Sequence, residues 1–134
     1  MELAPFGPDH LQGVLRLCEA EGWPSLPADP ERAVRALSAP GAVTVVALDQ
    51  GEVVGFAEAI TDGEIQAYLT FVVVAEGARR RGLGGRLVRE VFARSGAERL
   101  DLLTVEGVEG FYRSFSHRAI PGFRIYPGDA GPAG

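Results

Sequence analysis

The sequence VVVAEGARRRGLGGRL, residues 72–87, predicts a buried strand that leads through a glycine-rich turn into an amphipathic helix. The strand is expected over residues 64–74, and the apolar run at Phe71 to Val74 indicates burial on both faces near its end. Beyond the turn, apolar residues recur at helical spacing, so a helix should begin at Gly82 or Leu83 and end near residue 96.

The turn itself predicts a site for an anionic ligand. A helix N-terminus offers backbone N–H groups without intrahelical partners, and glycines at 82, 84 and 85 let the backbone come close to a diphosphate. The arginines at 79–81 add local positive charge to a chain whose formal net charge is -5. The P-loop does not fit because the turn has no lysine, and the third glycine of a dinucleotide fingerprint would fall at Leu87. A solvated arginine cluster beside a helix start is the alternative.

The remaining patterns complete an α/β order, β-α-α-β-β-β-α-β-α-β, on a mixed sheet. Periodicity and turn residues indicate these elements: strand 2–6, helix 8–22, loop 23–30, a helix through Val34 and Leu37, strands 42–48 and 53–60 joined at 49–51, a turn at 61–63, strand 100–104, helix 108–115 and strand 123–126.

Size and composition predict one domain, residues 1–127, followed by a mobile tail at 128–134 that is rich in Gly, Ala and Pro. The acidic net charge argues against nucleic-acid binding. Cys18 is the single cysteine and is expected to be buried, and the two histidines are far apart, so neither a disulfide nor a metal site is expected. The longest apolar run, Phe71 to Ala75, is too short to cross a membrane. A soluble, cytoplasmic protein is expected.

The turn Arg79-Arg80-Arg81-Gly82-Leu83-Gly84 resembles the Arg/Gln-x-x-Gly-x-Gly/Ala motif of the GNAT superfamily of acyl-CoA-dependent acyltransferases. The strand that ends at Val74, five residues before the motif, and the order of elements also resemble that family. The resemblance implies a GNAT-like fold, with a mixed, mostly antiparallel sheet flanked by helices and a splayed central strand pair. The strand at 100–104 would be the partner that separates from the long strand.

The resemblance also implies the cosubstrate acetyl-CoA, with no metal. The backbone of Val72 and Val74 would pair with the acetyl-pantetheine arm, and an N–H at Val73 or Val74 would polarise the thioester carbonyl. Backbone N–H groups from Arg80 to Gly85 would hold the pyrophosphate. The implied cofactor-binding residues are Val72, Val73, Val74, Arg79, Arg80, Arg81, Gly82, Leu83, Gly84 and Gly85.

A tyrosine on the last predicted helix, Tyr112, matches a further feature of the family. A phenol stays protonated at neutral pH and can give a proton to a departing thiolate, so Tyr112 is the predicted catalytic acid. Packing of the helix against the sheet is the alternative role. The chain departs from the family at Val105 and at residues 115–117, where Asn and Leu-Gly-Phe are frequent. Tyr68 stands where histone-modifying members carry a glutamate base.

The predicted function is N-acetyltransfer from acetyl-CoA to a primary amine of a small molecule or peptide. An acyl-CoA-binding regulatory module with little activity is the alternative. The acceptor pocket is expected beside the loop Trp23 to Leu26. The general base is left open among Glu58, Asp62, Glu64, His117 and water, with the hairpin carboxylates expected to be solvated. The sequence also leaves open the acceptor, acetyl versus a longer acyl donor, and monomer versus homodimer.

Overall fold

The computed structural model describes residues 1–128 of the chain. The chain divides into two compact units, Met1–Leu102 and a second unit that begins at Leu103. The first unit contains β1 (Glu2–Pro5), α1 (Leu11–Glu21), α2 (Pro30–Leu37), β2 (Ala42–Asp49), β3 (Glu52–Thr61), β4 (Gln66–Val74), α3 (Leu83–Ser95) and β5 (Arg99–Asp101), with short 3₁₀ helices at Pro8–His10 and Glu76–Ala78. The second contains α4 (Glu109–Arg113).

The strands of the first unit form one sheet in the order β1-β2-β3-β4-β5. Neighbours from β1 to β4 are antiparallel, while β4 and β5 are parallel. Parallel strands need a crossover connection, and α3 supplies it. This arrangement confirms the predicted α/β fold with a mixed, mostly antiparallel sheet.

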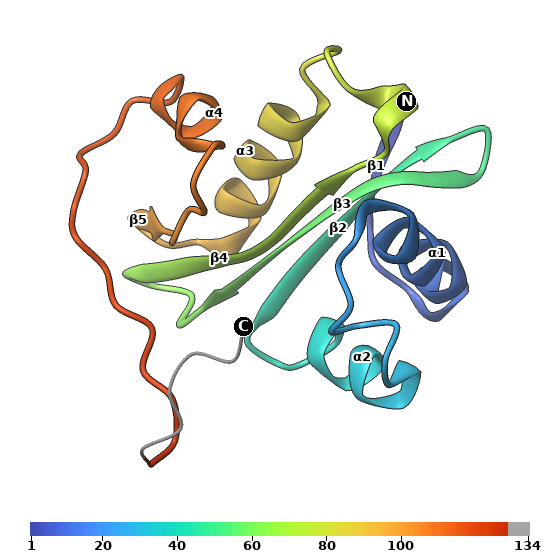
Figure 1. The fold of residues 1–134 in the computed structure, drawn as a ribbon, viewed down its shortest axis with the longest axis horizontal. Helices are drawn as coiled ribbons and strands as arrows, with labels where there is room; N and C mark the ends of the chain where they lie inside the picture. The colour runs from blue at the N-terminus through green and yellow to red at the C-terminus, as the bar shows by residue number, and fades with distance from the viewer. Residues whose placement is uncertain (129–134) are drawn as a thin grey trace. The chain divides into compact units, whose positions relative to one another are not determined.

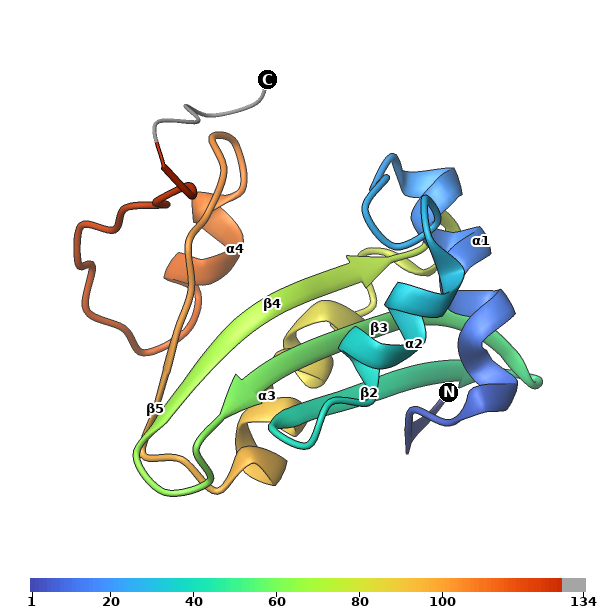
Figure 2. The same ribbon diagram turned by 90° about the horizontal axis from the view of Figure 1, so that it is seen from below.

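The helices cover opposite faces of the sheet, with α1 and α2 on one side and α3 on the other (Figures 1 and 2). Side chains alternate along β3, so Phe56 faces α1 while Gly55 faces α3. A Cβ at Gly55 would lie 3.2 Å from the Leu87 side chain, which shows how closely α3 packs on this strand. The small residue therefore sets the distance between α3 and the sheet.

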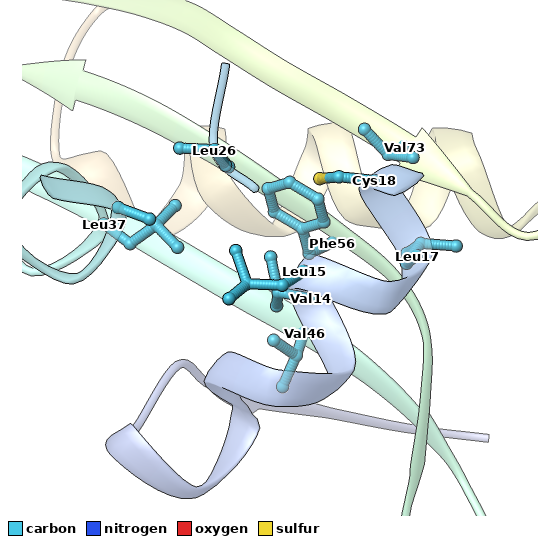
Figure 3. Packing of buried hydrophobic residues seen from close by; sticks show 10 residues of the cluster. Val14, Leu15, Leu17, Cys18, Leu26, Leu37, Val46, Phe56 and Val73 are labelled. Carbon is cyan, nitrogen blue, oxygen red and sulfur yellow. The ribbon is translucent and has the colours of Figure 1, made fainter. Parts of the chain in front are cut away.

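A hydrophobic core fills the space between the sheet and α1 (Figure 3). The ring of Phe56 is fully buried and is surrounded by side chains from α1, α2, the loop after α1 and the neighbouring strands. Cys18 belongs to this core as an unpaired thiol, as predicted, and burial raises its pKa to about 11. The cysteine is thus a neutral, apolar packing residue.

The two hairpin turns follow from local chemistry. Gln50 and Gly51 both have positive φ values, 51° and 83°, which match the tight turn favoured between twisted antiparallel strands. At the next turn, Asp62 Oδ1 accepts hydrogen bonds from the N–H groups of residues 64, 65 and 66. These bonds hold residues 64 and 65 in the turn, so β4 begins at Gln66 and the predicted start at Glu64 is wrong.

The pair β4–β5 is splayed, as predicted. Parallel pairing covers only Gln66 to Tyr68 of β4. Just beyond, the register passes from Ala59↔Leu69 to Glu58↔Phe71, which leaves Thr70 as the extra residue of a β-bulge. A bulge bends its strand, so from Leu69 onward, among the described residues, β4 pairs on one edge only, with β3.

The structure corrects two expectations, one about the length of β5 and one about the burial of β4. The predicted strand 100–104 is confined to Arg99–Asp101. Val73 is buried, but Val72 and Val74 are only half-buried, so the apolar end of β4 is not covered on both faces. A short β5 leaves that end without the second neighbour that full burial requires.

The second unit has less regular structure than predicted. α4 spans five residues rather than the expected 108–115. No strand forms at 123–126, where the side chains of Phe123 and Ile125 are 87% and 90% exposed. Alternation alone does not make a strand, because the backbone needs a partner to complete its hydrogen bonds. Of the predicted tail at 128–134, all but Gly128 lies outside the described residues.

Replacing Leu87 with alanine tests the packing of α3 on β3. Leu87 is fully buried, so L87A should lower the free energy of unfolding by about 3 kcal/mol, because truncation removes apolar contacts and leaves a cavity. Urea denaturation followed by circular dichroism measures the change. The exposed neighbour Arg86 provides the control, since R86A should change the free energy by less than about 0.5 kcal/mol. Equal losses in both variants would contradict this packing.

Candidate active site

The N-terminus of α3 presents a group of free backbone donors. Gly82 caps the helix with a left-handed backbone, φ 73° and ψ 11°, and its carbonyl accepts the first helical hydrogen bond from Arg86 N. Within residues 1–128 we find no acceptor for the N–H groups of residues 80–85. These donors and the helix dipole favour an anion at this turn. The backbone geometry fits the predicted pyrophosphate site.

Arg79 has a different environment from the other arginines of the turn. Its guanidinium forms an ion pair with Glu21, the last residue of α1, and its Nε donates to the Val74 carbonyl at 3.3 Å. Glu21 also accepts from the backbone N–H of Glu76 at 3.3 Å. Arg79 therefore ties the turn to α1 and β4, a contact that the sequence analysis missed because its partner is 58 positions away.

Arg80 and Arg81 supply the free positive charge of the turn. Both are exposed, and neither has a hydrogen-bond or ion-pair partner among the described residues. Arg80 has a positive φ of 67°, which is uncommon for a residue with a side chain. The two side chains are available to an anionic ligand, whereas the charge of Arg79 is already paired with a carboxylate.

The open edge of β4 carries the second set of backbone groups. Ala75 N–H donates to Val54 of β3 at 2.8 Å, which fixes the direction of the backbone groups because they alternate along an antiparallel strand. Val73 opposite Phe56 therefore faces β3, while the N–H and C=O of Val72 and Val74 face away from it. Of the two N–H groups predicted to polarise a carbonyl, the one at Val73 is committed to β3, and the one at Val74 has no acceptor within residues 1–128, although the Val74 carbonyl accepts from Arg79 Nε.

Glu58 lies in the middle of β3 and is only 2% exposed, so the expectation of a solvated hairpin carboxylate is wrong for it. Thr70 Oγ1 is 2.6 Å from Glu58 Oε1 and Thr44 Oγ1 is 3.3 Å from Oε2. Desolvation raises the pKa of the Glu58 carboxyl, and the hydrogen bonds of the two threonines only partly oppose that rise. No charged partner compensates the burial within the described residues.

Hydrogen-bond geometry also favours a protonated Glu58. Thr44 has one hydroxyl proton, and the Leu37 carbonyl at 2.8 Å is a better acceptor for it than Glu58 Oε2 at 3.3 Å. The hydroxyl of Thr70 is likewise shared between the Glu58 side chain and its backbone carbonyl at 3.0 Å. If Glu58 is protonated on Oε2, that proton can be donated to the Thr44 oxygen, while the Thr44 proton is donated to the Leu37 carbonyl.

The other two predicted bases lie far from Val74, at the opposite end of β4. Asp62 and Glu64 belong to the β3–β4 turn, and eight residue steps along β4 separate Gln66 from Val74, about 26 Å at 3.3 Å per residue. The three N–H groups that bind Asp62 lower its pKa and make it a poor proton acceptor. Glu64 is exposed. The structure thus does not bring the three carboxylates together.

The loop after α1 reaches β4. Trp23 is 40% exposed, as predicted, and its ring meets that of Phe71 edge to face with centroids 6.3 Å apart. Leu26 of the same loop is buried in the core. The loop therefore places an aromatic side chain at Phe71, which is opposite Glu58 in the sheet register.

Tyr112 belongs to the second unit, on α4. It is half-buried, and its ring contacts Phe111 edge to face with centroids 4.8 Å apart. Burial raises the pKa of the Tyr112 phenol, so the hydroxyl keeps its proton at neutral pH. In the same unit Val105 and His117 are exposed, and the His117 ring is held 2.8 Å from the Phe115 carbonyl.

Comparison with known proteins decides the family. The model of the Acetyltransferase (GNAT) family matches residues 9–115, which is most of the chain. The chain belongs to the GNAT acetyltransferase family. Among curated proteins, none matches it significantly by sequence.

Solved structures agree with this GNAT assignment. A GNAT family acetyltransferase from Streptococcus pneumoniae TIGR4 is 25% identical, with a TM-score of 0.71, over 95% of this chain and 98% of that one. Two aminoglycoside acetyltransferases show the same fold at lower identity. AAC(6')-IG from Acinetobacter haemolyticus is 15% identical, with a TM-score of 0.77, over 97% of this chain and 99% of that one. AAC(6')-Iy, solved with the bisubstrate analog CoA-S-monomethyl-acetylneamine, is 16% identical, with a TM-score of 0.78, over 96% of this chain and 98% of that one.

GNAT acetyltransferases use acetyl-CoA, and the free donors of residues 80–85 beside the outward backbone of Val72 and Val74 suit its diphosphate and amide-containing arm. In residues 1–128 no group of three or more His, Cys, Asp or Glu side chains could hold a metal ion. Nor does any helix of that part of the chain have the length and apolar character needed to span a membrane.

Replacing Gly82 with alanine tests the anion site. A Cβ would meet no atom within 4 Å, so G82A acts through its left-handed backbone, a strain of about 1 kcal/mol that shifts the free donors. Coenzyme A should bind at least about 10-fold more weakly by isothermal titration calorimetry. Gly63 is the matched control, since it has φ 81° and equally open space but lies in the β3–β4 turn. G63A should lose similar stability and keep the affinity; equal affinity losses would refute the site.

Replacing Glu58 with glutamine tests its protonation. Because the folded-state pKa is raised, the stabilising contribution of Glu58 is complete below its unfolded pKa of about 4.3 and is lost as the pH rises through the folded pKa. Glutamine is neutral throughout, so the melting temperature of E58Q relative to wild type should increase from pH 5 to pH 8. E52Q changes an exposed carboxylate of the same strand and should show no such trend. If the melting temperature of E58Q relative to wild type stays constant or falls as the pH rises, Glu58 is ionised in the folded protein.

Proposed function

We propose that the protein is an N-acetyltransferase that moves the acetyl group of acetyl-CoA to a primary amine of a small molecule or peptide. The observation that carries the proposal is the combination of free N–H groups at residues 80–85 with an outward-facing backbone at Val72 and Val74. The N–H groups at residues 80–85 suit a diphosphate, and the outward-facing backbone of β4 suits the amides of a pantetheine arm.

In this proposal Arg80, Arg81 and the backbone of Gly82 to Gly85 bind the pyrophosphate, and Arg79 positions the turn through Glu21. The outward backbone of Val72 and Val74 orients the pantetheine arm, and the free N–H at Val74 donates to the thioester carbonyl. That hydrogen bond strengthens as negative charge develops on the oxygen during attack by the amine. Holding both reactants in position supplies much of the rate.

Tyr112 is the proposed general acid. The amine nitrogen forms a bond to the acyl carbon, the carbon–sulfur bond breaks, and the phenol proton passes to the departing thiolate of coenzyme A. The raised pKa of Tyr112 supports this role because the phenol is protonated when the reaction begins. The proton that leaves the attacking amine goes to water, since Asp62 and Glu64 are at the far end of β4 and Glu58 is only 2% exposed.

The acceptor class is proposed from charge and from the named neighbours. Two structures of the same fold are named as aminoglycoside acetyltransferases, and an amine acceptor is cationic at neutral pH. A net charge of -5 would attract such cations. Small polyamines and aminoglycosides are therefore the first acceptors to assay, followed by arylalkylamines and peptide N-termini.

A cytoplasmic location fits a lone, buried, unpaired cysteine.

Removing only the hydroxyl of Tyr112 tests the function. Y112F should lower turnover by roughly 10²- to 10⁴-fold at unchanged coenzyme A affinity, because the phenol acts only as the thiolate departs. Thiol release from acetyl-CoA with the acceptor panel measures turnover. Tyr126, a half-buried tyrosine of the same unit, provides the control, and Y126F should keep the wild-type rate. Near wild-type turnover in Y112F would remove the acid role, and coenzyme A binding without thiol release from any amine would favour the regulatory module.

A further inference from the structure

Glu58 and Thr70 form a cluster that the proposed reaction does not use directly. Thr70 is the extra residue of the β4 bulge, and its hydroxyl contacts both the carboxyl oxygen and the backbone carbonyl of Glu58. On the other side, Thr44 links the same carboxyl to the Leu37 carbonyl at the end of α2. One buried carboxyl thus bridges β2, β3, β4 and α2.

The bulge decides which way the backbone of β4 points. It lies between the part of β4 that pairs with β5 and the open part that carries Val72 and Val74. If Thr70 moved into the regular ladder, the register would shift by one residue. The backbone groups of Val72 and Val74 would then turn toward β3 and those of Val73 would turn outward. The orientation of the open edge therefore depends on holding Thr70 out of register.

We propose that Glu58 is a positioning residue, which in its neutral form fixes the Thr70 bulge and so aims the open edge of β4 at the acyl-CoA arm. The inference rests on the proposed function for its ligand, but the bulge itself can be tested without one. A general base at the same position is the competing role, and it requires an ionised carboxylate that contacts the acceptor amine.

The surroundings of Glu58 support positioning. The carboxyl is 2% exposed, and within residues 1–128 its side-chain bonds are to two hydroxyls and to no charged group. From the packed elements, Cys18 of α1 is a buried neutral thiol and Tyr68 of β4 is partly exposed, and the charged residues of α2 are exposed. Within residues 1–128 the contacts of the Glu58 carboxyl are thus with neutral groups, and its exposure to solvent is small.

The ligand-free experiment is amide hydrogen exchange along β4. E58A should speed the exchange of the β3-facing amides of Phe71 and Val73 by at least about 10-fold, because the bulge loses one buried hydrogen-bond partner. T70V removes the hydroxyl while keeping the shape and should speed the same amides. The double variant should be no faster than E58A, since both changes break one contact. E52A is the control for loss of a carboxylate from β3. Unchanged exchange in E58A and T70V, or strictly additive effects, would overturn the proposal.

The ligand experiment separates positioning from base catalysis. E58A should weaken coenzyme A binding about 10-fold and raise KM for acetyl-CoA in proportion, whereas E58Q, which can accept from Thr70 and donate to Thr44, should restore both to within about 3-fold. The pH–rate profile of E58Q should match wild type. A loss of turnover of about 10²-fold or more in E58Q, at unchanged affinity and with a changed pH profile, would assign a base and overturn positioning. If wild type binds no coenzyme A, the proposed function fails, and hydrogen exchange still decides the role of Glu58.

Discussion

The structure depends on a strand that has two neighbours at one end and one neighbour at the other. β4 pairs with β5 only over Gln66 to Tyr68, and the bulge at Thr70 then bends it away. Backbone groups that leave a ladder must find another partner or stay in contact with water. The open half of β4 therefore remains able to pair with an extended ligand, while its other edge stays rigid against β3. A splayed pair gives the sheet a binding edge without weakening its core.

The turn before α3 combines features that favour an anion within an acidic protein. The favourable potential is local, because it comes from backbone donors, the helix dipole and two unpaired arginines rather than from net charge. The third arginine stabilises the turn by pairing with Glu21 and the Val74 carbonyl. The anion site and the open strand edge are thereby connected through one side chain, so the two parts of an extended ligand would meet a single rigid surface.

A buried glutamate in the middle of the sheet is costly unless it is neutral and hydrogen-bonded. Two threonines hydrogen-bond Glu58, burial raises the pKa of its carboxyl, and its location beside the bulge links the cost of burial to the geometry of β4. An apolar residue at this position would remove the carboxyl contact of the Thr70 hydroxyl and keep its contact with the backbone carbonyl. The polar cluster therefore contributes specificity of strand geometry more than stability.

Features that depend on neighbouring residues could be read from the sequence. The order of elements, the hairpin at Gln50-Gly51 and the limits of α3 follow from periodicity and from glycines at positive φ. The glycine-rich turn before α3 was equally visible, because a strand, glycines and a helix start occur together. Thr70 stands just before the apolar run of β4, but its place in a bulge is defined only by the register with β3. The burial of Glu58, the ion pair of Arg79 with Glu21, the early end of β5 and the absence of a strand at 123–126 were decided by tertiary structure. Each depends on which distant segments pair, and a one-dimensional pattern records which face a residue prefers but not whether a partner covers it.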